Sequence, residues 1–357
     1  MRLYSVEIFS RDFRLIQHYN ATDPIYAYDY LSAVENSVLL PYLAAVKVGQ
    51  YVRISDGDLE FFGVISAVDT GAVAAGYSEV KYKPFLSIFD QQILFDTDLQ
   101  GSAVSLEQMI ADQITAGWIQ SGDTSQDVPG LSVTTVSTTT GWGFHLTSDV
   151  EGAHKCVINF QQVILMRALT KYRVACVVHP DFTQHTITIE IGVPQAPRMT
   201  IEADLPSVID KSFLLMETSQ SINKVIVYDK ADMVTSMTFY LHPDGSYDTT
   251  DADRMLPVLQ AVRLADVEEG QAFADAAYTL AGQDLGGMEY RNLIELTVLN
   301  DDGLVLASSM TIGQECDIIS NGSTYTSIMT AIERGSVTKL TFGAVRVDLT
   351  QILKGRQ

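Results

Sequence analysis

Short runs of residues that alternate between apolar and polar dominate the first hundred positions of this chain. Two such runs, residues 51–55 and 61–66, flank the tripeptide Asp56-Gly57-Asp58. When apolar and polar residues alternate along a strand, one face of the strand packs on a core and the other faces solvent. Glycine tolerates the positive φ that a tight hairpin turn requires. Many short strands separated by such turns are typical of a barrel or sandwich. The pattern therefore predicts a small β-barrel over residues 1–100.

Further runs with the same alternation complete this predicted barrel. The strand at 79–89 is expected to close it. The expected strands are at 4–8, 25–30, 37–42, 51–55, 61–66 and 79–89.

The next region, residues 101–205, changes to a helical period. Ser105 can cap a helix that runs to Thr115, and Gln108 can return the capping bond three residues later. A second helix is predicted from Asn159 to Thr170. Strands are expected at 172–178 and 186–191, on either side of a turn at His179-Pro180-Asp181, and a β-prone stretch covers 131–140. This order predicts a compact α+β domain.

Three prolines between this region and the rest make residues 195–206 the predicted linker. Beyond it, residues 206–357 read as a second β-barrel domain with one inserted helix. Strands at 221–228 and 234–241 are expected to pair as a hairpin. Asp266 and Glu269 fit a capping box before the helix, and Gly286-Gly287 can end that helix in a left-handed conformation. The remaining strands are expected at 293–299, 304–307, 316–319, 325–333 and 336–347.

Charge and cysteine content restrict the class of protein. The chain of 357 residues has 44 Asp and Glu against 23 Lys and Arg, a net charge of -21, so tight non-specific binding of nucleic acid is excluded. Its three cysteines, Cys156, Cys176 and Cys316, suggest no disulfide framework and fit a reducing compartment. The first residues lack the apolar core of a signal peptide, and no apolar run is long enough for a membrane anchor.

Motifs for common catalytic chemistry are missing. The chain contains no His-Glu-x-x-His, Gly-x-Ser-x-Gly, phosphate-loop or Gly-x-Gly-x-x-Gly sequence. Ser221-x-x-Lys224 matches a serine/lysine nucleophile pattern, but in a strand two side chains three residues apart point to opposite faces. The sequence does not exclude a pair of carboxylates for glycoside hydrolysis, because among 44 acidic residues some pair will always lie close together.

Three further groups of residues could carry chemistry, and each has a simpler structural reading. His179 and His185 near Asp181 could bind a metal, but turn histidines are the favoured reading. His154 and Cys156 lack a third residue that would orient them as a nucleophile pair. We predict no catalytic, cofactor-binding or metal site. The acidic loop that could hold calcium, although its spacing does not fit an EF-hand, contains Asp244, Asp248, Asp251 and Asp253.

The order of these elements resembles the tail hub and baseplate hub proteins of long-tailed bacteriophages, the family that includes the N-terminal part of tail-associated lysins. The likeness covers nearly the whole chain and rests on order, since each motif alone is weak. The segments that carry it are Tyr51-Val52-Arg53-Ile54, Phe62-Gly63-Val64-Ile65, Tyr82 to Phe89, the helices 105–115 and 160–171 with strands 172–176 and 186–189, Ser212-Phe213, Ile222 to Tyr228, and Ile312-Gly313-Gln314-Glu315-Cys316-Asp317.

The resemblance implies a structural protein and not an enzyme. It implies two tube-like β-barrel domains, 1–100 and 206–357, plus a smaller α+β domain, 101–205, in a mainly β chain. Three copies would form a ring with six barrels that matches a sixfold tail tube and lets DNA pass without binding it. In relatives the lytic activity lies in further C-terminal domains. Because this sequence ends at Gln357, soon after its last predicted strand, we expect a hub without a lytic domain of its own.

Expected partners follow from the same resemblance: two further copies in a homotrimer, the distal tail protein or tail tube hexamer, the tape measure protein, and a tip fibre, spike or receptor-binding protein. The expected location is the virion tail tip, after assembly in the bacterial host cytoplasm. The alternative is a β-barrel adhesion or carbohydrate-binding module of a phage tail or injection device, for which the Asp244 to Asp253 loop would suit calcium. An enzyme is the third possibility.

Overall fold

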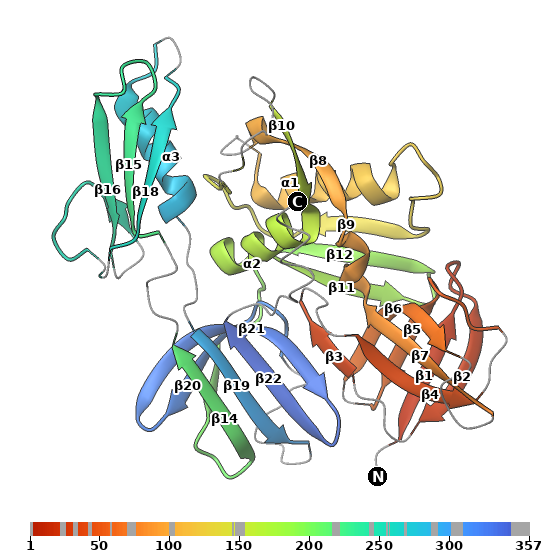
Figure 1. Ribbon diagram of the computed structural model, residues 1–357. Coiled ribbons are helices and arrows are strands. Elements are labelled where there is room, and N and C mark those ends of the chain that lie inside the picture. Colours follow the sequence, from red (N-terminus) through yellow and green to blue (C-terminus); the bar gives the residue numbers. More distant parts are fainter. Residues whose placement is uncertain are drawn as a thin grey trace.

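The computed structural model is built mostly of strands, in four groups (Figure 1). Two curled sheets lie side by side, a unit of helices and short strands packs above them, and a small sheet with one helix stands beside that unit. The predicted mainly β architecture with an α+β part is confirmed. The structure describes residues 3–21, 26–30, 35–41, 45–57, 59–69, 76–99, 104–144, 146, 154–215, 222–242, 246–254, 256, 258–267, 270–286, 292–300 and 310–343.

The first sheet is antiparallel and curls until its two edge strands approach each other. Cα atoms of these edge strands, β2 and β4, come within 8 Å without ladder pairing. The predicted turn at Gly57, with φ of +90°, joins β5 to β6. In spatial order the strands are β2 (Leu15–Ala21), β1 (Tyr4–Phe9), β5 (Tyr51–Ser55), β6 (Glu60–Asp69), β7 (Tyr77–Pro84) and β4 (Asn36–Pro41).

The strand predicted at 79–89 is wrong in its second half. Strand β7 ends at Pro84, and η1 (Phe85–Phe89) is a 3-10 helix. Phe85, Leu86 and Phe89 are all buried, a spacing that fits one helical face rather than alternate faces of a strand. The chain thus leaves the first sheet by turning into the core of the neighbouring unit.

The second sheet is also curled and takes one strand from the N-terminal region, β3 (Tyr26–Asp29), which pairs with β21. Its edge strand β13 falls inside the segment predicted as a linker and pairs in parallel with β20. The domain boundaries 1–100, 101–205 and 206–357 stay a prediction. The order along the sheet is β13 (Met199–Glu202), β20 (Glu315–Ser320), β21 (Ser323–Arg334), β22 (Val337–Gly343), β19 (Asn292–Leu299) and β14 (Val208–Leu215).

The α/β unit, which spans residues 85–193, contains both predicted helices of that region. Ser105 caps α1 (Leu106–Ile114), with 3.2 Å between its Oγ and the amide of Gln108. Asn159 caps the second helix, which runs as a π-helical turn η4 (Phe160–Leu165) into α2 (Met166–Tyr172). The other elements are β8 (Gln92–Asp96), η2 (Thr97–Leu99), η3 (Thr115–Ile119), β9 (Leu131–Thr135), β10 (Lys155–Asn159), β11 (Ala175–Asp181) and β12 (Thr186–Gly192).

Two details of this unit differ from expectation. The side chain of Gln108 donates to Asp112 one turn ahead, so the capping bond is not returned. Strand β11 continues through Asp181, and the turn lies at 182–185 instead of 179–181. The Asp181 carboxylate starts that turn by accepting the amides of Thr183 and Gln184, both at 2.8 Å.

The 222–286 unit is a small sheet covered on one face by a helix. The predicted hairpin is confirmed, with β15 antiparallel to β16. The helix α3 (Phe273–Leu285) begins after Ala272 without a side-chain cap, and Asp266 instead pairs with Lys230 at 2.8 Å, so the expected capping box is wrong. Gly286 is extended at φ -72°, not left-handed. Glu269 and Gly287 lie outside the described residues. The strands are β17 (Tyr247–Asp248), β16 (Ser236–Leu241), β15 (Lys224–Asp229) and β18 (Gln260–Ala265).

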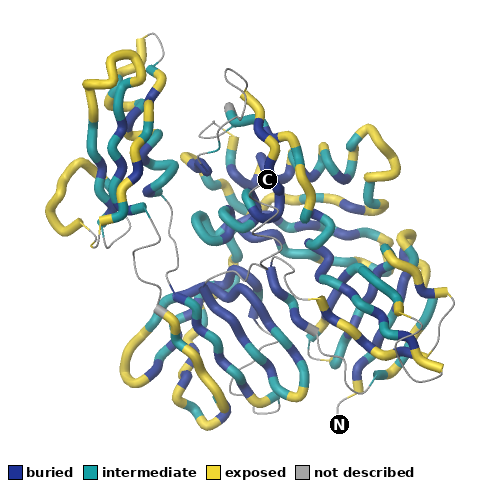
Figure 2. Tube along the Cα trace, in the orientation of Figure 1, coloured by how far each residue is buried: buried dark blue, intermediate teal, exposed yellow. Residues whose placement is uncertain are grey.

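The buried apolar side chains of the described residues form three clusters. Figure 2 shows where buried residues lie along the chain. The largest runs without a break from the second sheet through the α/β unit to one face of the first sheet. The second fills the inside of the first sheet, and the third belongs to the 222–286 unit alone. In the described part of the chain, no helix has the length and apolar composition that crossing a membrane requires.

Candidate functional site: the joint between the two curled sheets

The two curled sheets are joined by strand β3, which leaves the N-terminal region and pairs with the opposite sheet. Its residues Tyr26 to Asp29 pair antiparallel with Ala331 to Arg334 of β21. Its free edge is held by the first sheet, because the buried Asn36 side chain accepts the amide of Ala27 at 2.7 Å and donates to its carbonyl at 3.0 Å. Asn36 thus replaces a strand partner, and β3 is bonded to both sheets.

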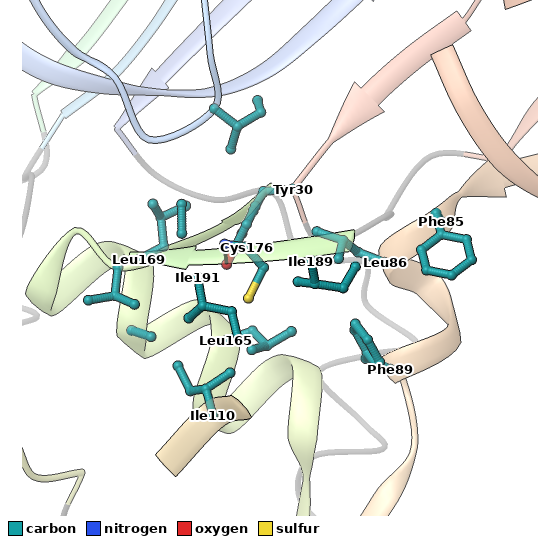
Figure 3. Close-up of a cluster of buried hydrophobic side chains, with 14 of the residues drawn as sticks. Tyr30, Phe85, Leu86, Phe89, Ile110, Leu165, Leu169, Cys176, Ile189 and Ile191 are labelled. Carbon is teal, nitrogen blue, oxygen red and sulfur yellow. Dashed lines mark hydrogen bonds between the residues drawn. The ribbon is translucent and has the colours of Figure 1, made fainter. Parts of the chain in front are cut away.

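Tyr30, directly after β3, ties a third part of the molecule to this joint. Its amide donates to the carbonyl of Thr330 in the second sheet at 3.1 Å, while its hydroxyl accepts the amide of Cys176 at 3.1 Å. Figure 3 shows the ring reaching into the core of the α/β unit towards Cys176. Because Tyr30 is 1% exposed, burial raises the pKa of its hydroxyl well above the ordinary value.

A buried ion pair makes the second direct link between the sheets. The guanidinium of Arg334, in β21, lies 3.0 Å from the carboxylate of Asp56, in the β5–β6 turn of the first sheet. Both side chains are almost fully buried. Arg334 also donates to the Thr338 hydroxyl at 2.6 Å, and that hydroxyl donates to Asn300 at 2.7 Å. The buried charges are therefore paired and hydrogen-bonded, as burial requires.

Basic side chains on both sheets lie next to acidic ones. On the first sheet, Arg53 lies between Glu7 at 3.2 Å and Glu60 at 2.5 Å. On the second, Lys339 lies 2.9 Å from Glu295. These cations are neutralised by neighbouring carboxylates, so they attract phosphate groups only weakly.

A cavity of about 440 Å³ lies where the three parts meet, between β3, β6, β11 and residues 310–312. Its lining is mostly apolar and includes Tyr28, Phe62 and Cys176. Burial raises the pKa of the Cys176 thiol to about 12, so the thiol stays protonated and is a poor nucleophile. Burial also raises the pKa of Cys316 to about 12. The joint therefore holds parts together and offers no activated nucleophile among these groups.

The histidine and acidic candidates are not brought together. The side chain of His179 lies 3.7 Å from Glu190, whereas His185 stacks on the ring of Phe13 in the first sheet. In the acidic loop, Asp248 contacts His242 and Asp251 contacts Arg254, and Asp244 lies outside the described residues. Among the side chains that the structure describes, no group of three His, Cys, Asp or Glu could hold a metal ion.

The nucleophile candidates Lys224 and Cys156 lie on strands of two different units. Lys224 lies on β15, where its ammonium group is 5.8 Å from the ring of Tyr240, and Ser221 is outside the described residues. Cys156 is buried in β10, and the carbonyl of His154 accepts the amide of Thr97 at 2.8 Å. The residues that form the joint were not singled out by sequence reasoning.

Comparisons with known proteins support the fold. No protein-family model and no curated protein matches the chain. Solved structures match over nearly the full length of both chains. The tail protein from Neisseria meningitidis MC58 is 10% identical, with 95% of this chain and 96% of that chain covered and a TM-score of 0.54. The prophage MuSo2 43 kDa tail protein from Shewanella oneidensis is 12% identical, with coverages of 95% and 98% and a TM-score of 0.51, and a chain of the phage P2 baseplate in its activated conformation is 10% identical, with coverages of 96% and 98% and a TM-score of 0.50.

At such low identity the likeness concerns the fold alone, and it extends over nearly the full length of the chain. The resemblance expected from the order of the sequence elements is confirmed at this level. The chain has the fold of bacteriophage tail and baseplate proteins over almost its whole length.

Proposed function

We propose that this chain is a structural tail hub protein that forms a trimeric ring at the distal end of a bacteriophage tail tube. The observation that carries the proposal is the joint: β3, Asn36, Tyr30 and the Arg334–Asp56 pair hold two curled sheets in one chain. Three copies then present six curled sheets, which is the number needed to meet a sixfold tube.

The charge of the chain suits a channel for DNA. Three copies carry three times -21, or -63, and a wall with this charge does not trap phosphates. Cations that neighbouring carboxylates neutralise, such as Arg53 on the first sheet, add little attraction. Under this proposal DNA passes the ring without specific binding, and the protein has a structural rather than an enzymatic role.

The remaining parts of the proposal are its partners and location. The ring would contact the distal tail protein or tail tube hexamer on one side and a tip fibre, spike or receptor-binding protein on the other, with the tape measure protein ending at the hub. Its place would be the virion tail tip, reached by assembly in the host cytoplasm. The full-length likeness to tail and baseplate chains supports these assignments.

Electron microscopy of the purified full-length chain tests the proposal. We expect class averages with threefold symmetry and six sheet-sized lobes around an open centre. Monomers that bind host cell-wall polysaccharide in a pull-down would instead support the alternative adhesion module. Clearing of a cell-wall zymogram by the purified chain would contradict the structural role.

A further inference from the structure

The sheet of the 222–286 unit is covered on one face only. Helix α3 packs on β15, β16 and β18, where it buries side chains such as Val227 and Phe239 against Ala277 and Ala281. No described element covers the opposite face of this sheet (Figure 1). A sheet with one uncovered face is a candidate surface for a partner.

The strand registers define the residues on this uncovered face. Ile226 of β15 lies between Thr238 of β16 and Val262 of β18, and the rows on either side follow the same pairing. Val262 is 49% exposed and Leu264 is 48% exposed. We call this set the outer grid. Its nine residues are Ser236, Thr238, Tyr240, Lys224, Ile226, Tyr228, Gln260, Val262 and Leu264.

The outer grid is nearly free of charge in a strongly acidic unit. Residues 222–286 contain 11 Asp and Glu against 4 Lys and Arg, a net charge of 4 minus 11, or -7. None of those acidic residues belongs to the outer grid, and its one cation, Lys224, lies over the ring of Tyr240. Asp248 flanks the grid on β17, beside His242. Depletion of charge at an apolar centre with a polar rim is the composition of a protein interface.

The outer grid points away from the rest of its own chain. The helix side of the unit faces the α/β unit, because Lys171 of α2 donates to the carbonyl of Gln283 in α3. The packing there is close: a Cβ atom on Gly143 would lie 2.5 Å from the Cγ of Gln283. Among the described parts of the chain none lies on the opposite face, so that face is open to a different molecule.

A second apolar patch lies on the α/β unit of the same chain. Leu94 of β8 and Val157 of β10 are directly opposite each other in the two-stranded ribbon. Leu94 is 62% exposed and Val157 is 58% exposed. The next pair on the same face of the ribbon is Asp96 with Lys155, which carry opposite charges. This ribbon patch lies at the far end of the α/β unit from the two curled sheets (Figure 1).

We propose that the outer grid of one copy binds the ribbon patch of the next copy. The inference rests on the proposed function, because a contact between two different surfaces of identical chains closes into a ring when the rotation permits. Copies with a charge of -21 repel each other over most of their surface, so contact is favoured where both surfaces are apolar and nearly neutral. The outer grid and the ribbon patch meet that condition.

Charge insertion tests the contact in the full-length protein. The double variant Val262→Glu with Leu264→Glu, and separately Leu94→Glu with Val157→Glu, should raise the protein concentration needed for half-assembly about tenfold or more. Val234→Glu is the matched control, since Val234 is 80% exposed on the same unit but lies in the hairpin turn outside the grid. Analytical ultracentrifugation gives the assembly state, and far-UV circular dichroism verifies folding.

Cross-linking gives an independent readout that does not depend on stability. A chain that carries both Val262→Cys and Val157→Cys should form disulfides between copies under mild oxidation, whereas a chain that carries Val234→Cys and Val157→Cys should not. The natural cysteines are buried. If the wild type is trimeric but the grid variants assemble like Val234→Glu, or the first cysteine pair gives no cross-link, this inference is wrong and the proposed function stands. A wild type that is monomeric at every concentration contradicts the proposed function itself.

Discussion

The joint between the curled sheets and the 222–286 unit differ in how they are attached to the molecule. At the joint, one strand is hydrogen-bonded to both sheets, and Tyr30 and the Arg334–Asp56 pair add buried polar links. The 222–286 unit has its own apolar core, and its contacts with the α/β unit include the hydrogen bond from Lys171 to Gln283 and the packing of Gly143 against Gln283. We therefore expect the sheets and the α/β unit to unfold together, while the 222–286 unit unfolds separately.

This difference matches the roles proposed for the two regions. Two sheets that must match a sixfold tube need a fixed relative position, which buried and directional bonds provide. A unit that binds a neighbouring copy needs an accessible face, and a fixed position relative to the rest of its chain matters less. The following substitutions test whether the two regions are as different as their contacts indicate.

Substituting Arg334→Ala should have the largest effect. It leaves the Asp56 carboxylate buried without its partner, and removing one member of such a pair costs about 3–5 kcal/mol of unfolding free energy. Urea unfolding followed by tryptophan fluorescence measures it, since Trp118 and Trp142 are both in the α/β unit. The control Arg14→Ala breaks an exposed pair with Asp12 beside the first sheet and should cost less than about 1 kcal/mol in the same tryptophan-monitored transition. Equal effects of the two substitutions would contradict the comparison.

Phe239→Ala should destabilise the 222–286 unit alone. The ring is 1% exposed in the core of that unit, and its loss should cost about 3–4 kcal/mol there. Limited proteolysis should then cut within residues 222–286 while the tryptophan-monitored transition stays at the wild-type urea concentration. A shared shift of both signals would mean that the unit and the body unfold as one.

Tyr30→Phe isolates one hydrogen bond of the joint. The ring stays in place, but the amide of Cys176 loses its acceptor in a buried site, which should cost about 1–2 kcal/mol. Tyr77→Phe, at a 47% exposed position on β7, is the matched control and should change stability by less than about 0.5 kcal/mol. A neutral Tyr30→Phe would show that the hydroxyl does not hold the α/β unit to the joint.

The smallest effect is expected at Glu107, a buried carboxylate in α1. Burial alone would raise its pKa, but hydrogen bonds from Ser137 and Thr139 outweigh burial and lower the pKa below its ordinary value of 4.5. A lowered pKa stabilises the folded chain above that ordinary value, and the stabilisation disappears as pH falls through the folded pKa. Glu107→Gln should therefore cost about 1 kcal/mol at pH 7 and less at pH 3 in urea unfolding. A cost that grows on acidification would contradict this assignment.

The sequence predicted most elements whose signal is local. Alternation located five strands of the first sheet but missed β2 at 15–21. Ser105 and Asn159 marked both helix starts in the α/β unit, and Gly57 marked a hairpin turn. The overall class and the resemblance to phage tail proteins followed from element order. Those predictions needed only neighbouring residues and their order along the chain.

The joint could not be predicted because its contacts join distant positions. Arg334 follows an apolar strand and reads as a surface cation until Asp56, 278 positions earlier, is placed beside it. Residues 26–29 read as one more strand of the nearest sheet, although they pair with residues 331–334. The helix start after Ala272 failed for a different reason, since the carboxylate expected to cap it pairs with Lys230.

The molecular mass of the purified chain in solution tests the central claim most directly. One chain has a mass of 39.2 kDa, so a ring of three copies has a mass of 117.6 kDa. We expect the larger mass by native mass spectrometry at micromolar concentration, with no population of stable dimers. A single species at 39.2 kDa under the same conditions would contradict it.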